Sequence, residues 1–379
     1  MEFNLSDEQK LIQQTAREFA QNEIAKDAAE RDQKEVFPER HVRKMGELGF
    51  MGMMVSPEYG GGGLDAISYT LVIEELSRAD ASVGVICSVN NSLVCYGLEK
   101  FASKQVKEKY LRPLAEGEKL GAFCLSEPGS GSDASGMTTT VDRDGDHYII
   151  NGAKNWVTNG QSADFYLVMA HTDRSAGYKG ISAFIVDKKS PGLHVGHKEK
   201  KLGIRSSDTA TITFDGCRVP AENLVGTEGQ GFKIAMQTLD GGRIGIAAQA
   251  LGIAQASLDA AVAYAKEREQ FGQPIASFQG IEFKLADMEL KISAARLLVH
   301  QAAWRKDQKI AFSVDAAKAK LFASETAVYV SAEAVQVFGG AGYLKDYPVE
   351  RYMRDSKITE IYEGTSEIQR IVIGRSLTK

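Results

Sequence analysis

The hydrophobic pattern of this chain changes twice, near Leu120 and near Gly226, and these changes limit the folds that it can adopt. Before Leu120 and after Gly226, apolar residues recur every three or four positions, as on one face of an α-helix. Between them, short β-branched runs alternate with turns rich in Gly, Asn and Asp, a pattern typical of several strands. A chain of 379 residues is also too long for one ordinary hydrophobic core.

We therefore predict an α+β multidomain protein with an N-terminal helical domain at 1–118, a middle β domain at 119–225 and a C-terminal four-helix-bundle domain at 226–379. The middle domain has no helical segments that could connect parallel strands, which favours an antiparallel barrel or sandwich. The helices predicted for the C-terminal domain lie at 231–268, 278–305, 313–338 and from 365 onward.

Composition indicates a globular protein and argues against several partners. Apolar residues make up 43% and charged residues 25% of the chain, as in soluble domains. The net charge of −5 argues against nucleic acid or an anionic membrane. No apolar run is expected to span a membrane, and Met1–Leu11 is too polar for a signal peptide. The four scattered cysteines indicate reduced core residues. We expect a cytoplasmic protein of bacterial type, with a processed organellar protein as the alternative.

Glu363 is the strongest candidate for a catalytic base. It lies between Tyr362 and Gly364, directly after the apolar run 358–361. Burial of that run would desolvate the carboxyl group and raise its pKa toward neutrality, as a general base requires. Gly364 would let the backbone turn, and Thr365-Ser366 would cap the following helix. The alternative is an ordinary first-turn Glu that the helix dipole favours.

Two segments of the β region are candidates for binding an anion or a ring. Ser126 to Asp133 is rich in Gly and Ser, so its backbone N–H groups and hydroxyls could hold an anion or a ring carbonyl. In the segment 154–160, Trp156 offers an aromatic face and Thr158 a hydroxyl donor. The alternatives are a surface loop and a hairpin strand whose Trp belongs to the core.

Two consecutive glycines, Gly241 and Gly242, interrupt a long helical pattern between Asp240 and Arg243. Together they cost about 2 kcal/mol relative to Ala in a helix interior, so we expect another group to approach the backbone there. The alternative is close helix packing beside an Asp–Arg pair. The sequence lacks G-x-G-x-x-G, G-x-x-x-x-G-K and G-x-S-x-G motifs, which argues against a Rossmann enzyme, a P-loop NTPase and a Ser hydrolase.

The run Ile-Tyr-Glu-Gly-Thr-Ser-Glu-Ile-Gln-Arg at 361–370 resembles the catalytic segment of the acyl-CoA dehydrogenases, and the resemblance extends over essentially the whole chain. It is closest to the short-chain (butyryl-CoA) branch. The family has the same helical, β and helical arrangement. The resemblance implies an FAD-dependent enzyme that converts an acyl-CoA to a trans-2-enoyl-CoA. Glu363 would remove the α-proton while the β-hydrogen leaves as hydride to FAD.

The resemblance also implies roles for further residues. Relatives that carry the base on the helix around Gly242 have Glu at or next to that position, so its absence leaves Glu363 as the base. The implied acyl-CoA contacts are Ser132, Asp240, Arg243, Tyr362 and Gly364. The implied FAD contacts are Phe123, Leu125, Ser126, Ser132, Trp156 and Thr158 in the β region, with Thr365 and Glu367 beside the base. Contacts to FAD of a neighbouring subunit would come from Arg268, Phe271, Gln279, Gln336, Gly339 and Gly340.

For the last set there are simpler alternatives: Arg268 would be a solvated helix end, and the glycines near 340 a helix stop. The implied partners are electron-transferring flavoprotein as the electron acceptor and a homotetramer built as a dimer of dimers. No metal site is expected. Three other functions stay open: a short branched-chain acyl-CoA dehydrogenase, an oxygen-using acyl-CoA oxidase or flavin monooxygenase, and a non-catalytic protein that binds CoA or flavin.

Overall fold

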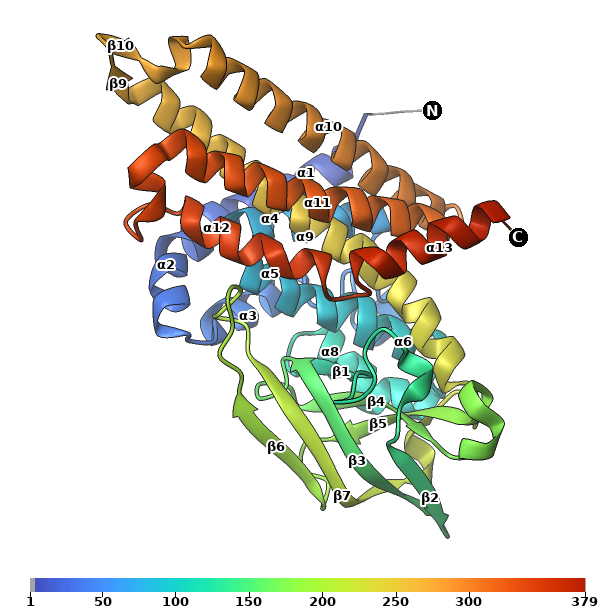
Figure 1. Ribbon diagram of the computed structural model, residues 1–379. Coiled ribbons are helices and arrows are strands. Elements are labelled where there is room, and N and C mark those ends of the chain that lie inside the picture. Colours follow the sequence, from blue (N-terminus) through green and yellow to red (C-terminus); the bar gives the residue numbers. More distant parts are fainter. Residues whose placement is uncertain (1–3, 379) are drawn as a thin grey trace.

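The computed structural model describes residues 4–378, with the helices of both ends of the chain in one layer and the sheet beside it (Figure 1). Ser6 caps the first helix, because its hydroxyl accepts from Gln9 N at 3.1 Å and its N–H donates to the Gln9 side chain at 3.0 Å. The first part contains α1 (Asp7–Phe19), α2 (Ala25–Lys34), α3 (Glu39–Glu47), α4 (Ala66–Ala79), α5 (Ala81–Ser88), α6 (Tyr96–Phe101), α7 (Lys104–Val106) and α8 (Arg112–Ala115), with π-helical turns η1 (Ala20–Ile24), η3 (Val89–Cys95) and η4 (Lys107–Leu111).

The middle of the chain forms a sheet with strand order β6-β7-β3-β2-β4-β5-β8, and β1 pairs with β4. The strands are β1 (Gly121–Cys124), β2 (Thr140–Asp144), β3 (His147–Thr158), β4 (Phe165–His171), β5 (Ile181–Asp187), β6 (Leu193–Lys198), β7 (Thr209–Pro220) and β8 (Leu224–Val225). β4 is buried on both faces. Leu167 and Met169 pack toward the helices, and Tyr166 and Val168 pack into the core of the sheet.

Most strand pairs are antiparallel, as predicted, but the sheet is mixed. β1 runs parallel to β4 over four residue pairs, and Thr140 of β2 also pairs with His171 of β4 in parallel. The β2–β3 hairpin lies in the connection from β1 to β4. A parallel pair therefore forms here without a crossover helix, which the sequence argument did not anticipate.

The last part contains α9 (Gly231–Glu267), α10 (Gln279–Asp307), α11 (Ser313–Phe338), α12 (Val349–Ser356) and α13 (Ser366–Thr378), with the short strands β9 (Glu269–Gln270) and β10 (Gln273–Pro274) between the first two helices. α9, α10 and α11 pack against one another, and α13 packs against α11. The helix predicted at 231–268 is present as α9, and the glycine pair at 241 and 242 lies inside it. The polar helix α12 was not predicted.

The two helical parts share a hydrophobic core. α4 packs against α9 and α10, and one buried cluster contains Leu76 and Ile86 from the first part with Leu251 and Val330 from the last. The boundaries predicted at 118 and 225 therefore stay a prediction, since packing continues across the helical layer. Residues 1–3 and Lys379 of the predicted domains lie outside the described residues.

Two helical stretches, Ala81–Phe101 and Gly231–Glu267, are long and apolar enough to cross a membrane by length and composition alone, contrary to the sequence expectation. Their most apolar windows are 94% and 72% buried inside the protein. A helix that is apolar on all sides also occurs in the core of a large protein, and both stretches have that position here.

Candidate active site

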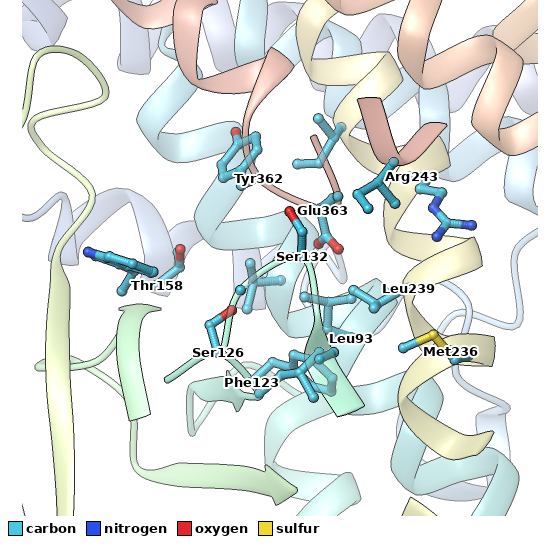
Figure 2. Close-up of a pocket in the computed structure, with 18 of the residues that line it drawn as sticks. Leu93, Phe123, Ser126, Ser132, Thr158, Met236, Leu239, Arg243, Tyr362 and Glu363 are labelled. Carbon is cyan, nitrogen blue, oxygen red and sulfur yellow. The ribbon is translucent and has the colours of Figure 1, made fainter. Parts of the chain in front are cut away.

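A cavity of about 290 Å³ lies between the helical layer and the sheet. Figure 2 shows Glu363 and Tyr362 on the helical side, across the cavity from Phe123 and Ser126. Its walls come from α5, η3, the segment after β1, β3, α9 and the segment around the start of α13. Its lining residues are Val85, Val89, Leu93, Phe123, Leu125, Ser126, Gly131, Ser132, Asp133, Ala134, Ser135, Asn155, Trp156, Thr158, Phe232, Met236, Leu239, Arg243, Ile246, Tyr362, Glu363, Gly364 and Ile368.

The backbone turns sharply at Glu363, where two successive residues are left-handed. The φ angles are 55° at Glu363 and 86° at Gly364. A non-glycine residue in this conformation costs about 1–3 kcal/mol, so its surroundings must hold it. Thr365 then caps α13, since its hydroxyl accepts from Ile368 N at 3.4 Å. The predicted turn and cap are confirmed. The turn carries the chain into α13 while the Glu363 side chain points into the cavity (Figure 2).

The Glu363 carboxyl group has the electrostatic properties of a base. Its Oε2 is buried and has no hydrogen-bond partner among the described residues. Burial raises the pKa of Glu363 to about 7, although the positive charges of Arg243 and Lys320 act in the opposite direction. The predicted rise in pKa is confirmed. A carboxylate with this pKa can accept a proton near neutral pH.

The glycine pair of α9 makes room for this carboxyl group. A Cβ atom at Gly242 would lie 2.9 Å from Cδ of Glu363 and 2.8 Å from Cδ2 of Leu93. Both distances are too short for an ordinary van der Waals contact, so this position requires glycine. The prediction that another group approaches the backbone here is confirmed, and the approaching group is the candidate base itself.

A buried ion pair joins the two polar segments of the β region. Lys154 Nζ donates to Glu127 Oε1 at 2.7 Å and to the Leu125 carbonyl at 3.1 Å, and the Lys154 and Glu127 side chains are 0% and 2% exposed. Asn155 N also donates to the Ser126 carbonyl at 2.8 Å. The segments that begin at Leu125 and at Lys154 are therefore held side by side at the cavity.

Trp156 and Thr158 present polar and aromatic groups at this wall. Trp156 lies at a β-bulge between Lys154 and Val157, has a φ of 56°, and leaves 60% of its side chain exposed. The alternative that this Trp belongs to the core is wrong. An exposed indole, the Thr158 hydroxyl and the half-buried ring of Phe123 at one cavity wall suit a planar heteroaromatic ring such as a flavin.

Asp240 lies apart from this cavity, although Arg243 lines it. The Arg243 guanidinium donates to Asp240 Oδ1 at 2.5 Å, and the Ser313 hydroxyl donates to the same oxygen at 2.9 Å. Asp240 and Ser313 line a second cavity of about 850 Å³. Lys100, Lys306 and Lys309 line it too. The Asp240–Arg243 pair therefore stands between the two cavities.

The structure brings most of the predicted residues together, but it leaves one set away from both cavities. Arg268, Gln279, Gln336, Gly339 and Gly340 are exposed, and Phe271 is 95% exposed at the tip of the β9–β10 hairpin. Thr365, which caps α13, and Glu367 in its first turn also lie outside the cavity lining. Within this one chain, the set predicted to contact the FAD of a neighbouring subunit, which begins with Arg268, does not line either cavity.

Sequence reasoning missed the buried polar groups that support the site. Lys320 Nζ donates to the Gly364 carbonyl at 2.8 Å, and Gln369 Nε2 donates to the carbonyls of Glu363 at 3.1 Å and Gly364 at 2.8 Å. The Tyr362 hydroxyl donates to Gln249 Oε1. One signal was present: Lys320 follows Ala316, Ala317 and Ala319, so a charge stands on the apolar face of its helix.

Comparisons with known proteins agree with this geometry. Family models match the acyl-CoA dehydrogenase N-terminal domain at residues 6–118, the middle domain at 122–217 and the C-terminal domain at 229–378. The chain is 52% identical to a short-chain-specific acyl-CoA dehydrogenase of Clostridium acetobutylicum over 98% of each chain. It matches the structure of butyryl-CoA dehydrogenase from Megasphaera elsdenii with 49% identity, full coverage of both chains and a TM-score of 0.99.

A second solved structure, described as an electron transferring flavoprotein of Acidaminococcus fermentans, contains a chain that is 52% identical, with full coverage of both chains and a TM-score of 0.99. Three family models that together cover most of the sequence, and full-length relatives near 50% identity, match the helical, β and helical order of the fold. The chain therefore belongs to the acyl-CoA dehydrogenase family.

Proposed function

We propose that this protein is a short-chain acyl-CoA dehydrogenase that uses FAD and converts a saturated acyl-CoA to the trans-2-enoyl-CoA. The observation that carries the proposal is the Glu363 carboxyl group, which is buried without a donor, has a pKa near 7 and faces the wall formed by Phe123 and Ser126. The short-chain-specific and butyryl-CoA dehydrogenases that this chain resembles support the substrate class.

Glu363 takes the α-proton of the thioester, and the electron pair of that C–H bond forms the new double bond as the β-hydrogen leaves with its electrons. The chemistry that FAD supplies is acceptance of this hydride. Trp156 and Thr158 would contact the flavin ring, with Phe123, Leu125, Ser126 and Ser132 bordering it. Tyr362, Gly364 and Arg243 would contact the acyl-CoA beside the base. The positively charged lysines that line the second cavity together with Asp240 suit the phosphate groups of CoA.

The purified protein should be yellow, and butyryl-CoA should bleach it in the absence of oxygen. Straight C4 to C6 acyl-CoA substrates should give the highest catalytic efficiency. A protein that binds CoA or flavin without catalysis would keep its colour. Higher efficiency with isobutyryl- or 2-methylbutyryl-CoA would favour the branched-chain alternative and leave the reaction type standing. Rapid steady turnover in air without an added acceptor would favour an oxidase.

Electron-transferring flavoprotein is the acceptor that we propose. The structure described as an electron transferring flavoprotein of Acidaminococcus fermentans, which contains a closely similar chain, supports this partner.

We further propose a homotetramer in which FAD is shared between subunits. The apolar residues Phe283, Leu290, Leu297 and Trp304 are spaced seven residues apart on α10 and are 60%, 69%, 56% and 44% exposed. An exposed apolar stripe with this period suits packing against another helix. The residues predicted to reach a neighbour's FAD are exposed as well, as such contacts require.

Arg268→Ala tests the shared site. The variant should retain FAD less well and melt at a lower temperature, and excess FAD should restore both, because FAD stabilises the state that binds it. Equilibrium dialysis and thermal melts with and without FAD give the measurement. Lys266→Ala, which removes an exposed charge two residues away at the same helix end, is the control and should change neither. Unchanged FAD affinity in Arg268→Ala would contradict the shared site.

A further inference from the structure

Lys320 is a buried lysine directly behind the turn that carries Glu363. It lies on α11 with 0% of its surface exposed, and its Nζ donates to the Gly364 carbonyl at 2.8 Å. Burying an ammonium group is costly unless hydrogen bonds and opposite charge compensate for the lost hydration. A lysine kept at this position therefore needs a reason that apolar packing does not provide.

The first reason lies in the backbone. Glu363 and Gly364 are both left-handed, and their carbonyls receive hydrogen bonds from only two side chains among the described residues. Lys320 binds the Gly364 carbonyl from α11, and Gln369 binds both carbonyls from α13. Together they fix the peptide groups on the C-terminal side of the base, and so the direction in which its side chain leaves the chain.

The second reason is charge. Among the described residues no ion pair within 4 Å joins Lys320 to a carboxylate, so its charge acts on Glu363 through space. Burial lowers the pKa of Lys320 to about 8, while Glu363, Glu360 and Glu367 favour its charged form and Arg243 opposes it. Glu363 in turn faces Arg243 from α9, Lys320 from α11 and the phenol of Tyr69 from α4.

We propose that Lys320 is a positioning residue for the base: it holds the Gly364 carbonyl, and with it the left-handed turn, and its charge favours the carboxylate form of Glu363. The inference rests on the proposed role of Glu363 in proton abstraction. Arg243 is held by Asp240, which offsets part of its charge. Lys320 has no such close partner, so it supplies a positive charge near the base that no adjacent carboxylate neutralises.

The test compares Lys320→Met, which removes the donor and the charge at similar length, with Gln369→Leu, which removes only neutral donors. Anaerobic flavin reduction by butyryl-CoA is followed against pH in each holoenzyme. Lys320→Met should lower the limiting rate about tenfold or more, as a misplaced base does, and raise the midpoint of the pH profile by about one pH unit. Gln369→Leu should lower the limiting rate and leave the midpoint near that of wild type.

A second readout does not depend on turnover. An infrared difference titration of wild type against Glu363→Gln isolates the carboxyl band of Glu363, and Lys320→Met should shift its titration to higher pH. Lys318→Met, an exposed lysine on the same helix, is the control for both readouts. Lys320→Arg retains charge and donor, so it should keep the wild-type midpoint and recover part of the rate.

The outcomes separate the two proposals. If butyryl-CoA does not reduce the wild-type flavin, the proposed function fails. If wild type reacts normally and Lys320→Met keeps both its rate and its midpoint, only the role of Lys320 is refuted. If Lys320→Met does not fold, the test rests on Gln369→Leu and Lys320→Arg. A wild-type rate in Gln369→Leu would overturn the role of the hydrogen bonds to the turn. A shifted midpoint in Lys320→Arg would overturn the electrostatic role.

Discussion

Glu363→Gln should retain FAD and acyl-CoA but lose flavin reduction by several orders of magnitude, in line with the roughly 10²–10⁴-fold contribution of a positioned general base. The amide has nearly the shape of the carboxyl group and cannot accept the α-proton. On α9 the bare backbone of Gly242 faces this carboxyl group, so that helix supplies no replacement carboxylate at this point. Stopped-flow reduction by butyryl-CoA without oxygen measures the effect.

Binding and chemistry need to be separated in this experiment. FAD content and the affinity for acyl-CoA should match wild type, since the amide keeps nearly the size and shape of the carboxyl group in the cavity wall. Glu325→Gln, which neutralises an exposed carboxylate on α11, is the control and should reduce flavin at the wild-type rate. A Glu363→Gln variant that kept even a tenth of the wild-type rate would show that the base lies elsewhere.

Lys154→Met should lower the free energy of unfolding by about 3–5 kcal/mol, because it leaves the buried Glu127 carboxylate without its partner. The pair is fully buried, and Glu127 also accepts from Thr138 N at 2.5 Å and Thr139 N at 3.1 Å, so it cannot turn toward water. Since the same ion pair joins the two segments proposed to hold the flavin, FAD retention should fall too. Urea unfolding gives the first quantity and dialysis the second.

The exposed pair Arg218–Asp144, with side chains 47% and 63% exposed, is the matched control. Arg218→Met should change stability by less than about 1 kcal/mol. Adding Glu127→Gln to Lys154→Met should recover part of the loss.

Burial raises the pKa of Glu127, but Lys154 and the hydrogen bonds from Thr139 and Thr138 lower it from 4.5 to about 2. The stability from the pair is therefore complete above pH 4.5 and lost as pH falls toward 2. A loss below 1 kcal/mol in Lys154→Met would contradict this role.

The sequence was informative wherever local chemistry decides the structure. Gly364 and the polar pair Thr365-Ser366 predicted a turn followed by a helix cap, and both are present. Glu363 Oε2 is buried, but not because the run 358–361 is buried as expected, since Ile361 is 49% exposed. The glycine pair at Gly241 and Gly242 was informative in a different way. Its cost predicted the close approach correctly, and tertiary packing keeps the pair helical inside α9.

Groups that act across the fold were not predictable. Lys320 contacts Gly364 from 44 residues away, and Gln249 contacts Tyr362 from 113 residues away, so no local sequence pattern specifies those contacts. The parallel pairing of β1 with β4 was missed for the same reason, since it depends on how the β2–β3 hairpin folds over. The exposure of Trp156 follows from a bulge that reverses the alternation of a strand.

The core that α4 shares with α9 also affects how the chain is made. α4 and α5 leave the ribosome well before α9, and the whole middle region is translated in between, which takes several seconds at about 5–20 residues per second. During that time α4 can pack against α1 and α5, but its face toward α9 has no native partner. The first part of the newborn protein thus carries an exposed apolar surface through most of synthesis, and a molecule truncated before α9 is a target for chaperones and proteases rather than a stable fragment.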